Sequence, residues 1–406
     1  MATIMTQPAP HVVRKVEELI AAGSAAAPCA VVDVEAFDYN AAEMRSQADG
    51  LPIRVASKSL RSVTALRRAL DTDGFRGILA YSVPEAIALA RVGFDDIVVA
   101  YPSVNVPALR ELAADAALRE AVTVMIDSTA HLDLLGTLGA GPVRVAMDLD
   151  CTFRPVRRTG RWAIGPRRSP VRTADDAAAL ARACARSPHV QLVGMMAYEG
   201  QVASVPDGET GPVGAVKRWI RTSSLDDLAP RRAACIAAVR DHADLEFVNG
   251  GGTGSLGESA AEAAEFGTLT ELAAGSGFYT PAIFDSFTGV NHKAAAFFAC
   301  SVSRLPAKGW ATVNSGGWVA SGPPAADRLP VPVLPAGLKY SGTEGPGEVQ
   351  TPLRGRATKN LHVGDLVWFR HAKAGEMTEH VPELIAVSSS GVERWDTYRG
   401  QGWTFR

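Results

Sequence analysis

The chain has 406 residues, enough for two domains of ordinary size, and its 47% hydrophobic and 21% charged residues are typical of a globular protein with a large core. A formal net charge of −2, with no basic run, argues against a nucleic-acid-binding protein and against binding to an anionic membrane surface. No stretch approaches the roughly 20 apolar residues of a membrane span. Five cysteines, far apart and without metal-ligand spacing, indicate free thiols and a cytoplasmic protein.

The first segments of the chain predict two helices around a single strand. Apolar residues at helical spacing predict a helix over 11–22, and residues 36–47 predict another. Between them, residues 30–34 form a short apolar run typical of a strand. This strand would be a ninth in the repeating pattern that follows, so we expect it to join a second domain instead.

From residue 52 a repeating unit of short apolar strand, loop and helix sets in. Strands that alternate with helices predict a parallel sheet, and eight of them predict closure into a (β/α)8 TIM barrel over residues 48–284. The polar, Gly- and Pro-rich insertion from Tyr198 to about residue 224 is expected to be a loop, either a lid or a contact with a partner subunit. The eight strands are expected at 53–57, 77–82, 96–101, 122–127, 143–150, 191–198, 245–249 and 270–274.

The pattern changes after residue 285. Prolines are frequent between residues 323 and 352, and they exclude long helices there. We therefore expect a C-terminal all-β domain, made of residues 285–406 together with residues 1–47. Its strands are predicted at 294–305, 310–314, 361–369 and 384–387.

Lys58 ends the first predicted barrel strand, and a helical pattern follows it at once. The C-terminal ends of the strands are where barrel enzymes place their chemistry. A lysine amine can form a Schiff base there if its neighbours lower its pKa. The alternative interpretation is a solvated lysine at a strand end.

Two glycine-rich turns follow the seventh and eighth predicted strands, at 250–255 and 275–279. Consecutive glycines expose backbone amides, and Thr253 and Ser255 add hydroxyl groups, so such a turn can surround a phosphate. Barrels most often bind a phosphate at these two strands, although a surface turn is the alternative. In a closed barrel both turns lie beside Lys58. An aldehyde anchored by a phosphate would span that gap, and pyridoxal 5′-phosphate (PLP) is the obvious candidate.

Four segments that include these features resemble the fold-type III PLP enzymes, the alanine racemase-like barrels that include D-threonine aldolase and D-serine dehydratase. They lie at 52–62, 148–154, 250–255 and 275–279. The C-terminal part is similar to a narrower group, called amino acid deaminase/aldolase. That similarity lies in segments 316–323, 327–330, 344–352 and 368–376.

The resemblance implies a role for each matching residue. Lys58 would form the Schiff base with PLP, and Arg154 would face the pyridine nitrogen and keep it unprotonated. Tyr198 and Gln201 would line the pocket where the aldolases carry a catalytic histidine, so that Tyr198 or Glu199 could be the general base, with a core tyrosine as the alternative. The PLP phosphate would be bound by Gly251, Gly252, Thr253, Gly254, Gly277 and Tyr279.

His371 corresponds in this resemblance to a catalytic, metal-binding histidine. The second ligand of the related enzymes lies two residues further on, where this chain has Lys373. An ammonium group cannot ligate a divalent metal ion and would repel it. Either Glu376 or His380 completes a metal site, or Lys373 supplies a fixed positive charge in place of the metal.

The expected function is that of a PLP-dependent lyase acting on a β-hydroxy-α-amino acid. Retro-aldol cleavage to glycine, or another small amino acid, and an aldehyde ranks first, because it depends least on a strong metal ion. Dehydration to a keto acid and ammonia ranks second and racemisation third; a non-catalytic PLP carrier is the alternative from another class. The resemblance also implies D-configured substrates and a homodimer.

Overall fold

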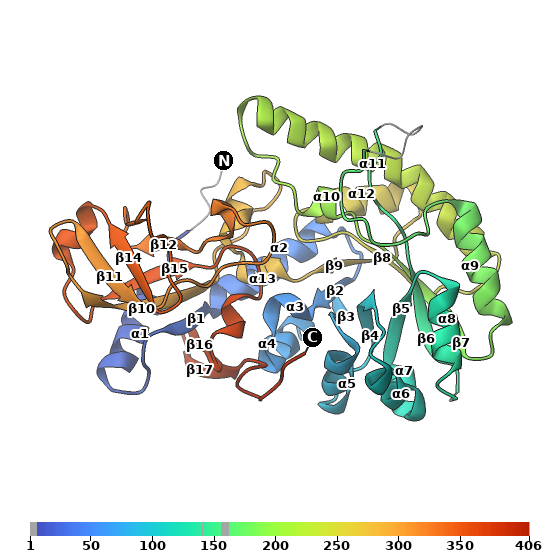
Figure 1. The fold of residues 1–406 in the computed structure, drawn as a ribbon, viewed down its shortest axis with the longest axis horizontal. Helices are drawn as coiled ribbons and strands as arrows, with labels where there is room; N and C mark the ends of the chain where they lie inside the picture. Colours follow the sequence, from blue (N-terminus) through green and yellow to red (C-terminus); the bar gives the residue numbers. More distant parts are fainter. Residues whose placement is uncertain (1–5, 140, 156–161, 406) are drawn as a thin grey trace.

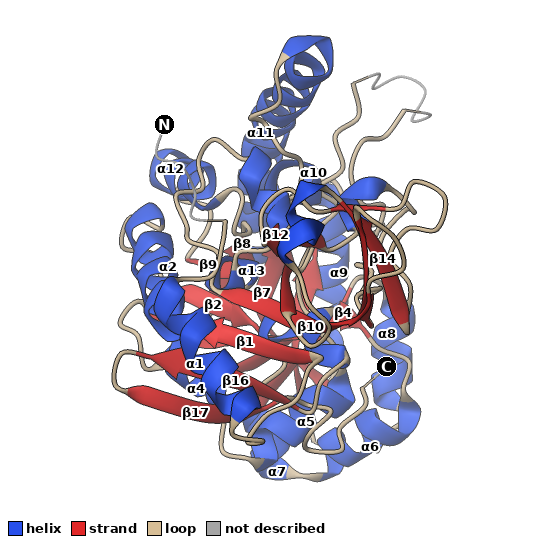
Figure 2. Cartoon of the chain, turned by 90° about the vertical axis from the view of Figure 1, so that its left-hand side faces the viewer, coloured by secondary structure: helices blue, strands red, loops and turns tan. Residues whose placement is uncertain are grey.

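The structure is a computed structural model that describes residues 6–139, 141–155 and 162–405. It contains a closed β/α barrel and, beside it, a second body built mainly of β-strands (Figure 1). Figure 2, turned by 90°, brings the strands of this second body toward the viewer. Within the described residues, no helix combines the length and the apolar character that a membrane crossing requires.

Eight parallel strands close the barrel within the described residues, each paired with the next along the chain. The last strand pairs with the first, with Ile53 opposite Leu272 and Val55 opposite Ala274. The predicted (β/α)8 barrel is therefore confirmed. The strands are β2 (Ile53–Ala56), β3 (Phe75–Ala80), β4 (Ile97–Pro102), β5 (Val122–Ile126), β6 (Val143–Asp148), β7 (Val190–Ala197), β8 (Phe247–Gly250) and β9 (Glu271–Ala274).

Helices cover the outside of the barrel, and three short helices stand at the C-terminal ends of its strands (Figure 1). The short helices are α3 (Ser57–Leu60), α10 (Gly200–Ala203) and α13 (Ser276–Tyr279). The outer helices are α4 (Val63–Leu70), α5 (Val83–Arg91), α6 (Val106–Ala114), α7 (Ala116–Ala121), α8 (Thr129–Gly136), α9 (Ala174–Arg186), α11 (Gly211–Arg240) and α12 (Leu256–Phe266).

The segment after Tyr198 differs from its prediction. Instead of a loop to about residue 224, helix α11 begins at Gly211 and continues for 30 residues through Pro230. The reason lies in its composition, because Lys, Arg, Leu and Ala between residues 215 and 229 are good helix formers even where the pattern is polar. Its N-terminal half extends beyond the barrel (Figure 2).

An ion-pair cluster and an apolar layer fill the barrel. The Arg54 guanidinium is only 1% exposed and donates two hydrogen bonds to Glu271, at 2.6 and 2.8 Å, and one to the Asp96 carboxylate at 2.8 Å. Because successive side chains of a strand alternate between its faces, Arg54 and Ala56 share the inward face of β2, and Lys58 follows in the first turn of α3. The apolar layer consists of Val98, Met125, Ala146, Val193, Met196 and Phe247.

The second body is a mostly antiparallel sheet, with nine strands among the described residues. The early strand β1 (Cys29–Asp33) lies in this sheet, antiparallel to β10 and parallel to β16. The other strands are β10 (Ala296–Arg304), β11 (Trp310–Asn314), β12 (Val331–Leu334), β13 (Lys339–Tyr340), β14 (Gln350–Arg354), β15 (Leu366–Arg370), β16 (Glu383–Ser388) and β17 (Gly391–Asp396). Helices α1 (Pro10–Ala21) and α2 (Val34–Gln47) belong to the N-terminal segment, and four 3-10 turns interrupt the C-terminal part, at Ala282–Ser286, Ala326–Arg328, Arg356–Asn360 and Met377–Glu379.

The two bodies pack against each other beside α3. The ring of Phe37 in α2 stacks on Phe278 of α13, with centroids 4.8 Å apart. From the C-terminal segment, the Tyr398 hydroxyl donates to the buried Glu85 carboxylate at 2.8 Å, and the Tyr398 amide donates to the Arg61 carbonyl at 2.9 Å. The second body therefore fixes the segment that follows β2. The predicted boundaries at residues 47 and 284 stay predictions.

Replacing Arg54 with methionine should destabilise the fold strongly. The change leaves the buried Glu271 without its ion-pair partner, which we expect to cost about 3–5 kcal/mol of the free energy of unfolding. The matched control is Arg144→Met, whose partner Glu246 has a side chain that is 51% exposed, so that its loss should cost about 1 kcal/mol or less. Urea denaturation measures both, and equal losses would contradict the role given to Arg54.

Candidate active site

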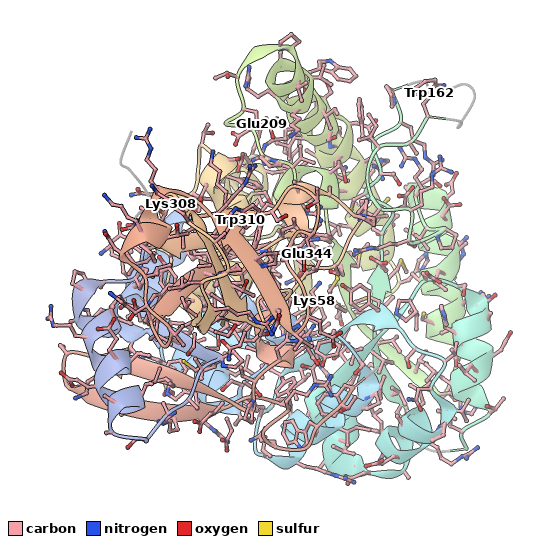
Figure 3. All side chains as sticks on the ribbon, turned by 60° about the vertical axis from the view of Figure 1, so that its left-hand side comes forward. Lys58, Trp162, Glu209, Lys308, Trp310 and Glu344 are labelled. Carbon is pink, nitrogen blue, oxygen red and sulfur yellow. The ribbon has the colours of Figure 1, made fainter. Side chains whose placement is uncertain are left out.

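Lys58 lies one residue past the point where β2 becomes α3, because the strand ends at Ala56. Its side chain is exposed, at the junction between the barrel and the C-terminal strands (Figure 3). Its Nζ donates a hydrogen bond to the hydroxyl oxygen of Tyr101 at 3.4 Å. The amine is therefore at the C-terminal end of the barrel, next to a phenol that the sequence analysis did not identify.

A segment of the second body lies directly over α3. Arg61 ends this helix in the left-handed conformation, with φ of 47°, and its Nε donates to the Lys58 carbonyl at 2.9 Å. Arg61 also forms an ion pair with Glu379. Gly375, with φ of 78°, approaches so closely that a side chain there would collide with the Lys58 carbonyl oxygen. The backbone of Lys58 is therefore held by both bodies.

Arg168 connects two tyrosines of this region. Its guanidinium carbon lies 5.4 Å from the ring centroids of both Tyr101 and Tyr198. Burial raises the pKa of the neighbouring Asp148 carboxyl to about 7, an effect that the positive charge of Arg168 opposes. The segment that carries Arg168 is held at the end of β6, because the Ser169 hydroxyl donates to the Asp148 carbonyl at 2.6 Å.

Arg154, the arginine expected to face the pyridine ring, is held elsewhere. Its Nη2 donates to the Asp150 carboxylate at 2.9 Å, and Arg172 donates to the same carboxylate oxygen at 3.0 Å. The structure thus brings Arg168, and not Arg154, against the aromatic rings beside Lys58. No signal in the sequence linked Arg168 to the end of β6, because nineteen positions separate it from Asp148 along the chain.

The first glycine turn is fixed by a buried carboxylate. Glu199 is fully buried and accepts hydrogen bonds from the Gly251 amide at 3.2 Å and from the Ser259 hydroxyl at 2.7 Å. It also accepts from Arg232 at 2.9 Å. With these partners Glu199 stabilises the turn, and it has no access to a substrate. The role of general base considered for it therefore has no support in the geometry.

The two glycine turns meet at Thr253. The Thr253 hydroxyl accepts from the Gly277 amide at 3.1 Å and from the Ser276 hydroxyl at 3.3 Å. A Cβ on Gly252 would lie 2.8 Å from the Ala203 Cβ, so glycine is required there. Within the described part of the chain, the amides of Thr253 and Gly254 have no acceptor and are available to an anion.

Tyr198 and Gln201 reach this region, whereas the Tyr279 hydroxyl does not. The Tyr198 hydroxyl lies 2.9 Å from the Ser204 hydroxyl, and Gln201 is bound to the Cys151 carbonyl at 2.6 Å. Tyr279 is almost completely buried, which raises its pKa, and its hydroxyl donates to the Leu60 carbonyl at 3.3 Å. The Tyr279 hydroxyl therefore binds the backbone at the end of α3 and is not directed at the first glycine turn.

His371 is fully buried, and burial lowers its pKa. Neither of its ring nitrogens has a hydrogen-bond partner within the described residues. The Lys373 amide donates to Glu376 at 2.7 Å, and the Lys373 side chain lies in electrostatic range of Arg328 and Lys58. Across residues 6–139, 141–155 and 162–405, His371 belongs to no group of three ligand atoms close enough to share a metal ion. Lys373, whose ammonium cannot ligate a metal ion, stands where the related enzymes carry their second ligand.

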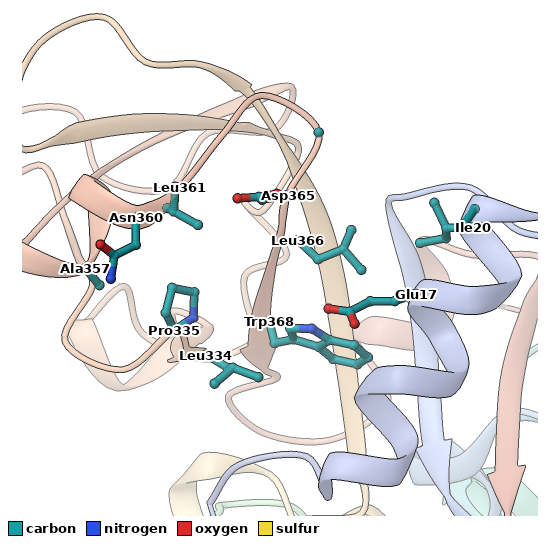
Figure 4. A pocket seen from close by; sticks show the side chains of 12 residues that line it. Glu17, Ile20, Leu334, Pro335, Ala357, Asn360, Leu361, Asp365, Leu366 and Trp368 are labelled. Carbon is teal, nitrogen blue, oxygen red and sulfur yellow. The ribbon is translucent and has the colours of Figure 1, made fainter.

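Two other features could be mistaken for the site. His11, Asp33 and Glu35 form a close group of possible ligands, but this group lies on α1, β1 and the start of α2, in the N-terminal segment. A cavity of about 560 Å³ lies between α1 and the strands around Trp368 (Figure 4). Its lining is mainly apolar, with the carboxylates of Glu17 and Asp365, and it contains no lysine that could form a Schiff base.

Comparisons with known proteins agree with this architecture. Residues 32–225 match the family model described as alanine racemase, N-terminal domain. A 3-hydroxy-D-aspartate aldolase from Paracoccus denitrificans (strain Pd 1222) is 25% identical over 241 residues, which are 56% of this chain and 54% of that protein. The chain thus spans about half the length of this relative.

Solved structures resemble the chain over most of its length. The crystal structure of D-threonine aldolase from Filomicrobium marinum has a TM-score of 0.76 at 22% identity, over 94% of this chain and 97% of that one. A D-threo-3-hydroxyaspartate dehydratase from Delftia sp. HT23 has a TM-score of 0.69 at 18% identity, over 92% and 98%. At these identities the likeness shows a common fold.

The raised pKa of Asp148 should make stability depend on pH. In the unfolded chain this carboxyl ionises near its ordinary value of 3.8, and in the folded chain at about 7. Between those values the folded state holds more protons, so stability falls as the pH rises, by about 2–3 kcal/mol between pH 5 and 8 for this group.

Asp148→Asn should therefore remove the fall in stability between pH 5 and pH 8, because asparagine does not ionise. The free energy of unfolding of Asp148→Asn, relative to the unmodified chain, should rise between pH 5 and pH 8. The matched control is Asp95→Asn, at an exposed position on the same barrel, which should leave the pH dependence unchanged. Parallel curves for the unmodified chain and Asp148→Asn would show that Asp148 is not perturbed.

Proposed function

From the alanine racemase-like fold of this chain, whose residues 32–225 match that family's N-terminal domain, we infer a PLP-dependent lyase acting on a D-configured β-hydroxy-α-amino acid. The observation that carries the proposal is the pairing of β2 with β9, which sets the Lys58 amine beside the glycine turns after β8 and β9. An amine next to turns that can bind a phosphate fits PLP. Bound there, PLP supplies a ring that stabilises negative charge at the substrate's α-carbon.

The residues around Lys58 support this assignment. The free amides of Thr253 and Gly254 stand just before α12, whose N-terminus favours an anion, so they would bind the phosphate. Arg168 would face the pyridine nitrogen in place of Arg154, because it lies between Tyr101 and Tyr198 at the barrel mouth. A guanidinium keeps its own proton and would leave that nitrogen unprotonated.

Retro-aldol cleavage is the reaction that the site supports best. It requires a base for the β-hydroxyl proton, whereas dehydration requires the hydroxyl itself to leave, and a Lewis acid assists that step. The expected second metal ligand is replaced by Lys373, and its ammonium near Lys58 can instead stabilise negative charge on the β-oxygen. The naming of a relative as 3-hydroxy-D-aspartate aldolase is in line with this choice.

Dehydration is the second candidate, because the dehydratase from Delftia sp. HT23 has the same fold. Racemisation would need a second base on the opposite face of the substrate, and a non-catalytic PLP carrier would not need the second body over Lys58. The homodimer and the cytoplasmic location stay predictions of the sequence.

Lys58→Ala should abolish both cofactor attachment and turnover. The purified protein should absorb in the visible range after addition of PLP, and it should convert D-threonine or D-phenylserine to glycine and an aldehyde. Lys58→Ala should lose the visible band and at least about 10³-fold in rate, since covalent attachment is lost. Lys308→Ala, at an exposed position on the second body, is the control and should retain both. If the products are a keto acid and ammonia, the reaction is dehydration. If the unmodified protein stays colourless after addition of PLP, the proposal of a PLP enzyme is wrong.

Chelation should leave cleavage intact. Dialysis against EDTA should change the rate by less than about twofold, because a fixed ammonium replaces the Lewis acid. Mock-dialysed protein is the control, and metal content is measured in both samples. A large loss of rate that Mn²⁺ or Zn²⁺ restores would show that His371 does bind a metal ion.

A further inference from the structure

Tyr101 is the side chain that contacts the Lys58 amine, and neither the sequence motifs nor the proposed function assigns it a role. It lies near the C-terminal end of β4, two strands from β2 around the barrel. Its hydroxyl oxygen accepts the Lys58 Nζ hydrogen bond at 3.4 Å. The Arg168 guanidinium lies 5.4 Å from its ring centroid, and the Lys58 Nζ lies 6.0 Å from it.

The position of this hydroxyl matters because Lys58 Nζ would hold PLP, and a substrate would be bound there through its amino nitrogen. In a β-hydroxy-α-amino acid the hydroxyl group is on the second carbon from that nitrogen. A phenol oxygen that is within hydrogen-bonding range of Nζ is therefore also within reach of the β-hydroxyl. Lys58, once released, remains beside the same phenol as a free amine.

The other groups considered as general base are less suitable. Glu199 is fully buried and bound to Arg232 and to the Gly251 amide. His371 is fully buried in the second body, and its ring lies edge-on to Tyr279, with centroids 6.3 Å apart. The Tyr198 hydroxyl is paired with Ser204. Tyr101 differs from all of them, because its hydroxyl is bound to the reacting lysine itself.

We propose that Tyr101 is a catalytic residue that takes the β-hydroxyl proton of the substrate, with Lys58 as the final acceptor. The β-hydroxyl proton moves to the Tyr101 oxygen while the Tyr101 proton moves to the free Lys58 amine. The O–H electron pair forms the aldehyde C=O bond and the Cα–Cβ bond breaks. The electron pair of that bond stays at Cα until a proton from the Lys58 ammonium completes the glycine product.

A neighbouring cation suits Tyr101 to this task. The positive charge of Arg168 stabilises the negative charge that develops on the phenol oxygen while its proton leaves, and Lys58 becomes the second cation as it receives that proton. The tyrosine is half-buried, so water screens these charges less than at an open surface. The inference rests on the proposed function, since it needs PLP on Lys58 and a β-hydroxy substrate.

Tyr101→Phe tests the proposal, because it keeps the ring that contacts Arg168 and removes only the hydroxyl. Three quantities are measured: the visible band of PLP on the protein, the cleavage rate of D-phenylserine, and the exchange of the glycine α-hydrogen with D2O by NMR. Cleavage should fall by at least about 100-fold, the usual contribution of a general base. The visible band and the glycine exchange should stay near the values of the unmodified protein, because neither uses a β-hydroxyl.

The control variant is Tyr39→Phe, which removes the hydroxyl of another tyrosine whose ring contacts a lysine, Lys293, at 3.8 Å. It should leave all three quantities unchanged. Equal losses of exchange and cleavage in Tyr101→Phe would mean that Tyr101 only positions Lys58, and unchanged cleavage would mean that another group is the base. Either result would overturn the proposal while leaving the proposed function intact. Absence of both band and exchange in the unmodified protein would overturn the proposed function, and this proposal with it.

Discussion

The ion pair between Arg54 and Glu271 joins the first and last strands of the barrel, and the arrangement of the site depends on it. These two side chains lie on β2 and β9, the strands whose pairing closes the barrel, and both are buried. Two parallel hydrogen bonds between a guanidinium and a carboxylate fix the relative orientation of the two side chains as well as the distance between them. The strand that leads to Lys58 is thereby set against the strand that leads to the second glycine turn.

Periodicity was sufficient to predict the barrel. Eight short apolar strands separated by helical patterns allow few other closed arrangements, and the extra strand at the N-terminus was recognised because it exceeded that number. The loop predicted after Tyr198 was wrong for a physical reason. Along the first turns of α11 apolar residues such as Val213, Val216 and Trp219 are exposed while Arg221 is buried, so helical propensity, and not an apolar stripe, was the available signal.

The site was only partly predictable. Lys58 and the turn around Thr253 could be found because their local sequence carries the chemistry. Arg168 and Tyr101 could not, since only contacts between segments that are far apart in the chain bring them beside Lys58. The role predicted for Tyr279 stays a prediction: its position in a motif suggested a ligand contact, and in the structure its hydroxyl donates to the Leu60 carbonyl.

The buried group formed by Glu199, Arg232 and Glu262 has a consequence for binding. Arg232 lies on α11 and Glu262 on α12, and both glutamates accept hydrogen bonds from the same guanidinium. Glu199 in turn holds the Gly251 amide, so the shape of the turn is determined during folding and not when a ligand arrives. The conformational entropy of the turn is lost once, on folding, and does not oppose each binding event. A phosphate would therefore meet a rigid, preorganised receptor whose affinity is determined partly by residues on the outer helices.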